Sequence, residues 1–228
     1  MSTITIECIG IKKTFQDSGS PAVEVLHGVD FKANQGEMIM LMGPSGSGKT
    51  TLLAIMGGIL APTSGSCSLL GKNLASMNDK EITQFRGDNI GFIFQKFMLV
   101  PTLSAIENTA IPLLCKNIPR EEAFKKAYEL LTSMGLEKQA YYASPQLSGG
   151  EQQRVALARA MIHSPSIILC DEPTSFLDSE RGKQIMELLK KVQKETHATV
   201  VVVTHDDRIL SFADRIVTIE DGKIINNQ

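Results

Sequence analysis

The chain has 228 residues, of which 43% are apolar and 21% charged, so its composition is that of a globular protein and excludes a disordered or fibrous chain. Its 23 basic and 25 acidic side chains leave a formal net charge of −2, which argues against a dedicated nucleic-acid-binding protein, because such proteins are usually basic. No apolar run approaches the roughly 18 residues of a membrane-spanning helix, and residues 1–7 lack the basic and apolar regions of a secretory signal.

Alternating apolar and polar residues predict strands in the first part of the chain. Residues 3–9 alternate with a period of two, as in a half-buried strand. Residues 23–31 read as a second strand region, and residues 38–42 form a short apolar strand that follows a turn. A helical run at residues 51–56 comes next.

Helical spacing dominates the middle of the chain. Apolar residues recur every three or four positions over residues 119–134, and Gly135 follows as the expected C-cap. Residues 151–163 form a second expected helix, which ends before Pro165. These helices indicate a mostly helical lobe, roughly residues 96–163, inserted into an α/β core.

Strands and helices alternate again after this lobe. Residues 167–170 and 198–203 are apolar and predict buried strands, and residues 179–194 between them predict an amphipathic helix. Buried strands that alternate with helices indicate a parallel sheet covered on both faces. The fold class that we predict is therefore α/β.

The cysteines indicate neither a metal site nor a redox motif. The four of them are far apart and no CxxC spacing occurs, so we expect reduced thiols in a cytosolic protein. They are Cys8, Cys67, Cys115 and Cys170.

Residues 43–50, which we call the phosphate loop, read GPSGSGKT and fit the pattern GxxxxGKS/T. The loop follows an apolar strand and opens a helical run, as this motif requires. Its glycines let backbone N–H groups converge on phosphate oxygens at a helix N-terminus, whose dipole also favours negative charge. Lys49 is expected to reach the β- and γ-phosphates, and the Thr50 hydroxyl to bind Mg²⁺.

Two carboxylates end the apolar strand at residues 167–170. In an open α/β sheet, ligands bind at the carboxyl ends of the strands. We expect Asp171 to hold the metal, and Glu172 to orient and polarise the attacking water as a general base. An acidic pair in this position is often only solvated, so its interpretation depends on the phosphate loop.

Residues 147–152, the signature segment, read LSGGEQ and predict a second helix start with exposed N–H groups. Most capped helix starts bind nothing. Here, however, the chain holds two anion-ready sites about a hundred residues apart, although one triphosphate needs only one cradle. A two-fold dimer resolves this surplus, because each subunit can place its signature segment against the phosphate loop of the other.

The signature segment resembles the LSGGQ signature of ATP-binding cassette (ABC) ATPases. Further resemblances follow in the family's order at the phosphate loop, Gln95, and residues 167–172, 175–178 and 204–206. The resemblance covers nearly all of the chain. Within the family, the chain is more similar to the MacB, LolD and DevA group than to other members. It implies one ABC ATPase domain over residues 1–228: a P-loop NTPase core with an N-terminal antiparallel β subdomain (1–95 and 164–228) and an inserted α-helical subdomain (96–163).

This resemblance also assigns roles to single residues. It implies that Gln95 binds Mg²⁺ and contacts the attacking water, that His205 touches the γ-phosphate, and that Asp178 lies at the dimer interface. Taken alone, Gln95 reads as a surface side chain and His205 as a merely hydrogen-bonded one. The implied catalytic residues are Glu172, His205 and Gln95, and the implied metal ligands are Thr50, Gln95 and Asp171. The implied ATP-binding residues are Phe15, Gly43, Pro44, Ser45, Gly46, Ser47, Gly48, Lys49, Thr50, Thr51, Ser148, Gly149, Gly150 and Gln152.

Two positions leave alternatives open. Phe15 occupies the place of the aromatic ring that stacks on adenine in the family, but it also reads as an ordinary half-buried residue at a strand end. Phe176 is bulky where the family usually has a small or polar residue, which puts the fine geometry of the dimer interface in doubt.

The resemblance implies a subunit that hydrolyses ATP with Mg²⁺ to power a separate membrane permease of an exporter or mechanotransmission system. Residues 97–114 then form either the core of the lobe or a groove in which the permease docks. A periplasmic adaptor would be connected to this chain through that permease. The expected assembly is an ATP-dependent homodimer, cytoplasmic and peripheral on the inner face of the membrane, with no nucleic acid. The alternative is an ATP-gated module of a membrane complex that controls cell-wall hydrolysis at division. A DNA-repair ATPase of the superfamily is disfavoured, because no coiled-coil heptads occur.

Overall fold

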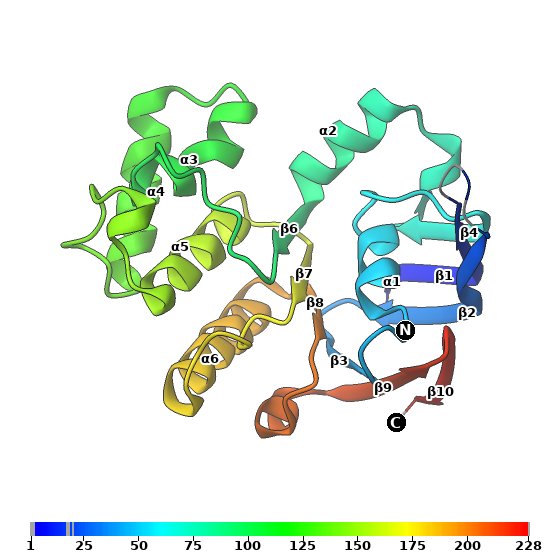
Figure 1. Ribbon diagram of the computed structural model, residues 1–228. Coiled ribbons are helices and arrows are strands. Elements are labelled where there is room, and N and C mark those ends of the chain that lie inside the picture. Colours follow the sequence, from blue (N-terminus) through cyan, green and yellow to red (C-terminus); the bar gives the residue numbers. More distant parts are fainter. Residues whose placement is uncertain (1–2, 17–18, 20, 228) are drawn as a thin grey trace.

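The computed structural model describes residues 3–16, 19 and 21–227, and its strands form two sheets (Figure 1). The first sheet is antiparallel, with the order β2-β1-β4-β5. Its strands are β1 (Ile4–Phe15), β2 (Val23–Asn34), β4 (Ser64–Leu69) and β5 (Lys72–Asn73). It confirms the strands expected at residues 3–9 and 23–31, but β1 runs on to Phe15 through several register shifts that no simple alternation reveals.

The second sheet has the order β10-β9-β3-β8-β7-β6 and is parallel except for β10. Its strands are β3 (Met38–Met42), β6 (Ile90–Ile93), β7 (Ile167–Asp171), β8 (Thr199–Val203), β9 (Arg215–Glu220) and β10 (Lys223–Asn227). The expected strands at residues 38–42, 167–170 and 198–203 are therefore confirmed and adjacent. Together with its helices, this sheet confirms the α/β fold class.

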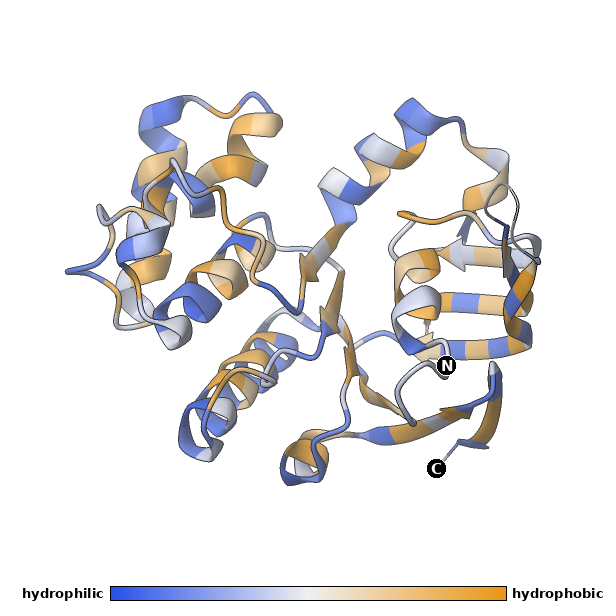
Figure 2. Ribbon diagram, in the orientation of Figure 1, coloured by the Kyte–Doolittle hydropathy of each residue, from blue (hydrophilic) through white to orange (hydrophobic). Residues whose placement is uncertain are grey.

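The central strands are mostly apolar (Figure 2), and their alternate residues belong to two buried cores, one on each face of the sheet. In β3, Met38 and Met40 belong to one core, whereas Ile39 and Leu41 belong to the other. The same alternation runs through β7 and β8. One core lies against helix α1 (Lys49–Met56) and the antiparallel sheet. The other lies against α6 (Ser179–Thr196) and the helical lobe.

The lobe expected at residues 96–163 contains α3 (Ala105–Cys115), α4 (Arg120–Ser133) and α5 (Gly149–Met161). The helices expected at residues 119–134 and 151–163 correspond to α4 and α5. After α4, Gly135 has a φ of +72°, and the N–H groups of Gly135 and Leu136 donate to the carbonyls of Thr132 and Leu131. This hydrogen-bond pattern is the Schellman ending that the glycine predicted.

Several elements differ from the sequence expectation or were not anticipated. Helix α5 begins at Gly149 rather than at residue 151, because Ser148 caps it. Helix α2 (Asp79–Asn89) buries only Phe85 and has no apolar stripe, so its periodicity gives no signal. Of the helices in the described part of the chain, none is at once long and apolar enough to cross a membrane.

Candidate active site

The phosphate loop connects the end of β3 to the start of α1, in the strand–loop–helix arrangement that the sequence predicts. Gly48 is the N-cap of α1, with a φ of +99°. Its positive φ favours glycine, and a Cβ atom there would also lie 2.7 Å from Cδ2 of Leu26 and 3.1 Å from the carbonyl oxygen of Val25, both in β2. The loop therefore ends at a helix N-terminus, where free N–H groups and the helix dipole favour an anion.

The Lys49 side chain is buried inside this loop. Its Nζ atom donates hydrogen bonds to the carbonyls of Gly43 (2.8 Å) and Pro44 (2.7 Å), which leaves a third ammonium proton for a ligand. Burial lowers the pKa of Lys49, and the charges of Glu172 and Asp171 oppose that shift. The Oγ atom of Ser47 is also buried and has no hydrogen-bond partner among the described residues, but Ser47 does not line the pocket that the loop borders.

An oxygen-rich corner joins the phosphate loop to the end of β7. The Thr50 hydroxyl donates to Oδ1 of Asp171 over 3.2 Å. Burial raises the pKa of Asp171, opposed by this hydrogen bond, and the nearby charge of Glu172 raises it further. A hydroxyl and a carboxylate are the ligands that Mg²⁺ takes in phosphate sites, where it keeps several waters. These two residues therefore fit the metal that the sequence predicts.

Glu172 is held from both sides. Gln95 Nε2 donates to its Oε2 over 2.7 Å, and His205 Nδ1 lies 2.9 Å from its Oε1. Glu172 adopts a φ of +46°, which is unusual for a residue other than glycine and typical of functional sites. Because β6, β7 and β8 are adjacent parallel strands, the three residues that follow their carboxyl ends meet at one edge.

A pocket of about 760 Å³ collects most of these groups, although Asp171 and Ser47 do not line it. Such a volume suits a ligand of nucleotide size. The lining residues are Val25, Gly43, Pro44, Ser45, Gly46, Gly48, Lys49, Thr50, Thr51, Gln95, Glu172 and His205. Val25 is the lining residue that sequence reasoning missed, because one valine in a strand carries no chemical signal. Phe15 is not among the lining residues. Phe15 is 43% exposed, and Lys13 Nζ lies over its ring, 5.1 Å from the centroid.

The signature segment does not line this pocket. Ser148 and Gly149 are exposed, and Ser148 caps α5 in a capping box with Glu151. The hydrogen bond from the Ser148 hydroxyl is the main reason why the pKa of Glu151 lies below its usual value. Gln152 Nε2 donates to the carbonyl of Leu147. The structure thus brings the phosphate loop, Gln95, Asp171, Glu172 and His205 together, but leaves residues 148–152 apart from them within one chain.

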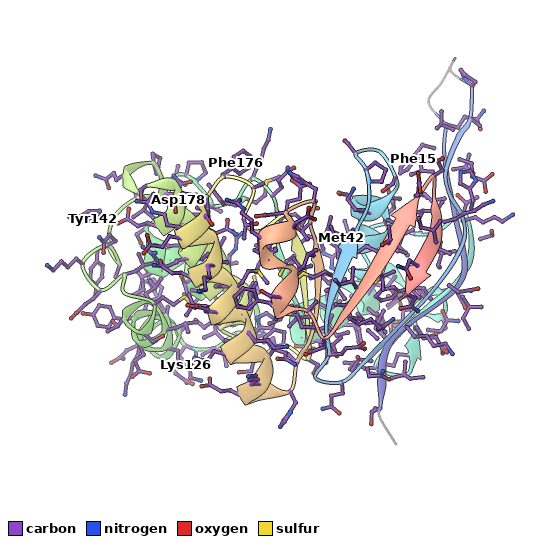
Figure 3. All side chains as sticks on the ribbon, turned by 90° about the horizontal axis from the view of Figure 1, so that it is seen from below. Phe15, Met42, Lys126, Tyr142, Phe176 and Asp178 are labelled. Atoms are coloured by element: carbon purple, nitrogen blue, oxygen red, sulfur yellow. The ribbon has the colours of Figure 1, made fainter. Side chains whose placement is uncertain are left out.

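Asp178 caps α6 by accepting a hydrogen bond from the Arg181 N–H. The unusual Phe176 lies two residues earlier and is 58% exposed. Its ring meets the ring of Phe97 edge to face, with 6.1 Å between the centroids. Figure 3 shows Phe176, Asp178 and Phe15 along the same edge of the molecule, and Lys126 lies at the opposite edge.

Residues 97–114 turn out to be part core and part surface. Ile106, Ala110 and Leu113 are buried in the lobe, whereas Met98 is 59% exposed. Arg159 of α5 donates to the carbonyls of Phe97 (2.7 Å) and Met98 (2.6 Å), and burial lowers its pKa. Sequence reasoning missed Arg159, because a side chain that binds main-chain carbonyls has no motif.

A groove of about 500 Å³ runs between α2 and α3, beside β6. Its apolar lining includes the stacked rings of Phe92 and Phe94, whose centroids are 4.3 Å apart, and Ile111 and Pro112 of α3. Arg86, Lys116 and His163 lie among its polar residues.

Comparisons with known proteins agree with this geometry. Residues 26–175 match the ABC transporter family. The chain is 43% identical to a "Lipoprotein-releasing system ATP-binding protein LolD" of Bacteroides fragilis, over 95% of this chain and 98% of that protein. It is 41% identical to a "Macrolide export ATP-binding/permease protein MacB 2" of Aeromonas hydrophila, over 98% of this chain and 34% of that protein. This chain therefore matches only about a third of the MacB protein.

A solved structure from an archaeal relative, MJ0796 of Methanocaldococcus jannaschii, has the same fold. Its description reads "Dimeric structure of a post-hydrolysis state of the ATP-binding cassette MJ0796 bound to ADP and Pi". It superposes with a TM-score of 0.92 at 42% identity, over 98% of this chain and 97% of that one. The chain therefore belongs to the ABC transporter family and is an ATP-binding cassette ATPase.

Proposed function

We propose that two copies of this chain bind and hydrolyse ATP at their shared interface and thereby drive a separate permease on the inner face of the cell membrane. The observation that carries the proposal is the Glu172 carboxylate, which lines the phosphate-loop pocket and is held by Gln95 and His205. The names of the LolD and MacB relatives, which refer to lipoprotein release and macrolide export, support a transport role.

In this proposal the phosphate loop binds the triphosphate. Backbone N–H groups of the loop meet phosphate oxygens, and Lys49 turns its remaining proton toward the β- and γ-phosphates. Thr50, Asp171 and Gln95 hold Mg²⁺, which neutralises charge on the phosphates when it is bound. Phe15, exposed at the end of β1, stacks on the adenine ring, and Val25 lines the pocket beside the phosphate loop.

Glu172 acts as the general base in this mechanism. A carboxylate has about four lone-pair sites, so the bonds from Gln95 and His205 orient its two oxygens and leave capacity to accept a proton from water. His205 then also lies within reach of the transferred phosphoryl group, as the family resemblance implies. Catalysis arises mainly from positioning and electrostatic stabilisation, as in other phosphoryl transfers.

The signature segment completes the site of the other copy. Ser148 and Gly149 are exposed at the start of α5, where helix N–H groups are available to an anion. An isologous two-fold interface lets Ser148 of each subunit face the phosphate loop of the other, and the description of the MJ0796 structure as dimeric supports a dimer. Asp178 and the exposed Phe176 then lie at the interface, near the partner's phosphate loop.

The groove between α2 and α3 is the proposed docking site of the permease. It overlaps the end of the predicted region 97–114 at Ile111 and Pro112, but extends to Phe92 and Phe94 of the core. An apolar groove of this kind suits a short amphipathic helix. A periplasmic adaptor would be reached only through that permease.

Mixing two inactive variants tests the shared site. Lys49→Ala disables the phosphate loop and Ser148→Arg disables the signature segment, so each variant alone should hydrolyse almost no ATP. A mixed dimer pairs the intact phosphate loop of the Ser148→Arg chain with the intact signature of the Lys49→Ala chain. Random pairing in an equal mixture should therefore restore about a quarter of the wild-type sites.

Phosphate release measured against the mixing ratio decides the outcome. Recovery of activity in the mixture supports the two-chain site. Full activity of Ser148→Arg alone, or no recovery in mixtures that form dimers, would contradict it. Tyr141→Arg, a change at a residue that is 71% exposed elsewhere on the lobe, controls for the added charge and should leave the activity unchanged.

A further inference from the structure

Two hairpin turns of this protein share one backbone conformation but differ in their surroundings. Leu70 and Gly71, between β4 and β5, have φ values of +49° and +77°. Asp221 and Gly222, between β9 and β10, have φ values of +42° and +71°. Two consecutive positive φ values are typical of the tight turns that join antiparallel strands, and they favour glycine at the second position.

The space around the two glycines is not the same. A Cβ atom on Gly71 would meet no atom of the described residues within 4 Å. On Gly222 it would lie 2.4 Å from the carbonyl oxygen of Val25 and 2.4 Å from Cδ2 of His27. A backbone oxygen cannot move aside as a flexible side chain can, so Gly222 is required by close packing in addition to its conformation.

Both polar groups of Gly222 are used in contacts outside its own hairpin. Its N–H donates to the carbonyl of Ser47 in the phosphate loop, over 3.1 Å. Its carbonyl accepts a hydrogen bond from the His27 N–H of β2, over 2.9 Å. The turn therefore joins the phosphate loop to β2.

The backbone of the phosphate loop is pressed against the same two elements at other points. A Cβ atom on Gly43 would lie 2.0 Å from the carbonyl oxygen of Ile219, in β9. A Cβ atom on Gly48 would lie 3.1 Å from the carbonyl oxygen of Val25, in β2. At Gly43 and Gly48 the backbone of the loop therefore packs directly against the backbones of β9 and β2, because neither residue has a side chain.

The bond from Gly222 to Ser47 controls the direction of a group that faces the pocket. The Ser47 carbonyl and the Gly48 N–H belong to one planar trans peptide, so they point in opposite directions. The hydrogen bond from Gly222 holds the Ser47 carbonyl toward the β9–β10 turn, so the Gly48 N–H points to the opposite side of the loop. Gly48 itself lines the pocket. A rotation of this peptide would turn the N–H away from a bound phosphate.

We infer that Gly222 is a positioning residue of the nucleotide site, and that the β9–β10 turn sets the orientation of the Ser47–Gly48 peptide. The inference rests on the proposal that the phosphate loop binds the triphosphate. Gly222 touches no substrate and acts only through Ser47 and the backbone of β2.

A comparison of Gly222→Ala with Gly71→Ala isolates this effect in the full chain, because both changes strain the same turn conformation. Gly222→Ala should raise the KM for Mg-ATP about tenfold or more, since misplacement of a binding group by about 1 Å is that costly. The kcat at saturating ATP should change by less than about threefold, because the turn holds the loop and not Glu172, Gln95 or His205. Gly71→Ala should keep KM within about twofold of wild type. Equal KM values in the two variants would overturn the inference.

Two further measurements keep the test decisive. Should Gly222→Ala fail to fold, hydrogen exchange of the wild-type chain replaces it. The Gly222 and His27 amides should then gain more protection from Mg-ATP than the Leu70 amide, which donates to the Thr5 carbonyl in the control turn. Equal protection would refute the inference. Lys49→Ala tests the underlying proposal separately: if that variant binds ATP normally, the assignment of the phosphate loop fails together with the inference. If it loses ATP binding while Gly222→Ala behaves like Gly71→Ala, only the role of Gly222 fails.

Discussion

The imidazole of His205 and the carboxylate of Glu172 lie in hydrogen-bond contact, with 2.9 Å between Nδ1 and Oε1, although 33 positions separate them in the chain. The contact follows from topology, because β7 and β8 pair in parallel and Asp171 lies opposite Val203. The residues just beyond these two strand ends therefore meet at one edge of the sheet. Gln95, beyond β6, binds the other carboxylate oxygen, so a neighbour on each side orients Glu172.

Changing Glu172→Gln should stop ATP turnover while leaving ATP binding intact. The amide keeps the size of the side chain and can still bond to its neighbours, but it cannot accept a proton from water. General bases contribute about 10²–10⁴-fold to rates, so phosphate release should fall by that factor. Equilibrium binding of a fluorescent ATP analogue and light scattering with ATP should show bound nucleotide and a trapped dimer.

Glu180→Gln is the control for this charge change, because Glu180 is exposed on α6. It should hydrolyse ATP at the wild-type rate. A Glu172→Gln protein that turns over normally would remove Glu172 from the role of general base.

Much of this site was predictable because its parts carry strong local patterns. The phosphate loop combines glycine, lysine and threonine at fixed spacing, and the strands β3, β7 and β8 are short apolar runs typical of a sheet that is covered on both faces. The order of those strands in the sheet then places Asp171 and Glu172 beside the loop.

Other parts had weaker signals or none. Helix α3 contains Pro112, which obscures its periodicity, although the capping box of Ser104 and Glu107 marks its start. Arg159 acts on main-chain carbonyls, and such contacts depend on the tertiary fold rather than on a motif. The contact of Gly222 with Ser47 joins distant segments and was equally invisible in the sequence.

Changing Glu151→Gln should produce a stability defect that depends on pH. Bonds from Ser148 lower the pKa of Glu151 in the folded chain from its ordinary value of 4.5. The ionised carboxylate therefore stabilises the fold above pH 4.5, and this stabilisation is lost as the pH falls through the lowered pKa. At neutral pH the variant should melt lower by at most about 2–4 °C, as for the loss of a capping interaction.

Thermal melts across this pH range measure the effect. The difference between variant and wild type should shrink below pH 4.5. Glu129→Gln, at an exposed position of α4, should show no such trend. A constant difference at all pH values would mean that the carboxylate charge of Glu151 does not contribute to stability.

Changing Asn108→Ala should destabilise the helical lobe. Asn108 is fully buried, accepts a hydrogen bond from the Val100 N–H (2.8 Å) and donates to the hydroxyl of Ser144 (3.0 Å). The same nitrogen lies within hydrogen-bond distance of the carbonyls of Val100, Leu103 and Ser104, so its two protons are shared among these acceptors and Ser144. Alanine leaves several of these groups buried and unpaired, so urea unfolding should show a loss of about 2–4 kcal/mol.

The matched control is Asn226→Ala, which removes an exposed amide in β10 and should change the free energy of unfolding by less than about 0.5 kcal/mol. A loss of similar size in both variants would show that the Asn108 network does not organise the lobe.

Changing Ile111→Glu should separate the ATPase from its membrane partner. Ile111 lines the groove between α2 and α3 together with Phe92 and Phe94, and a carboxylate there places a charge where an apolar face would dock. Co-purification from detergent-solubilised membranes should fall about tenfold or more, which corresponds to a loss of about 1.4 kcal/mol or more of binding free energy. The affinity for ATP should not change, because Ile111 does not line the nucleotide pocket.

Tyr141→Glu, on the exposed surface of the lobe, is the control and should retain the partner. Retention of the partner by Ile111→Glu would move the docking site away from this groove.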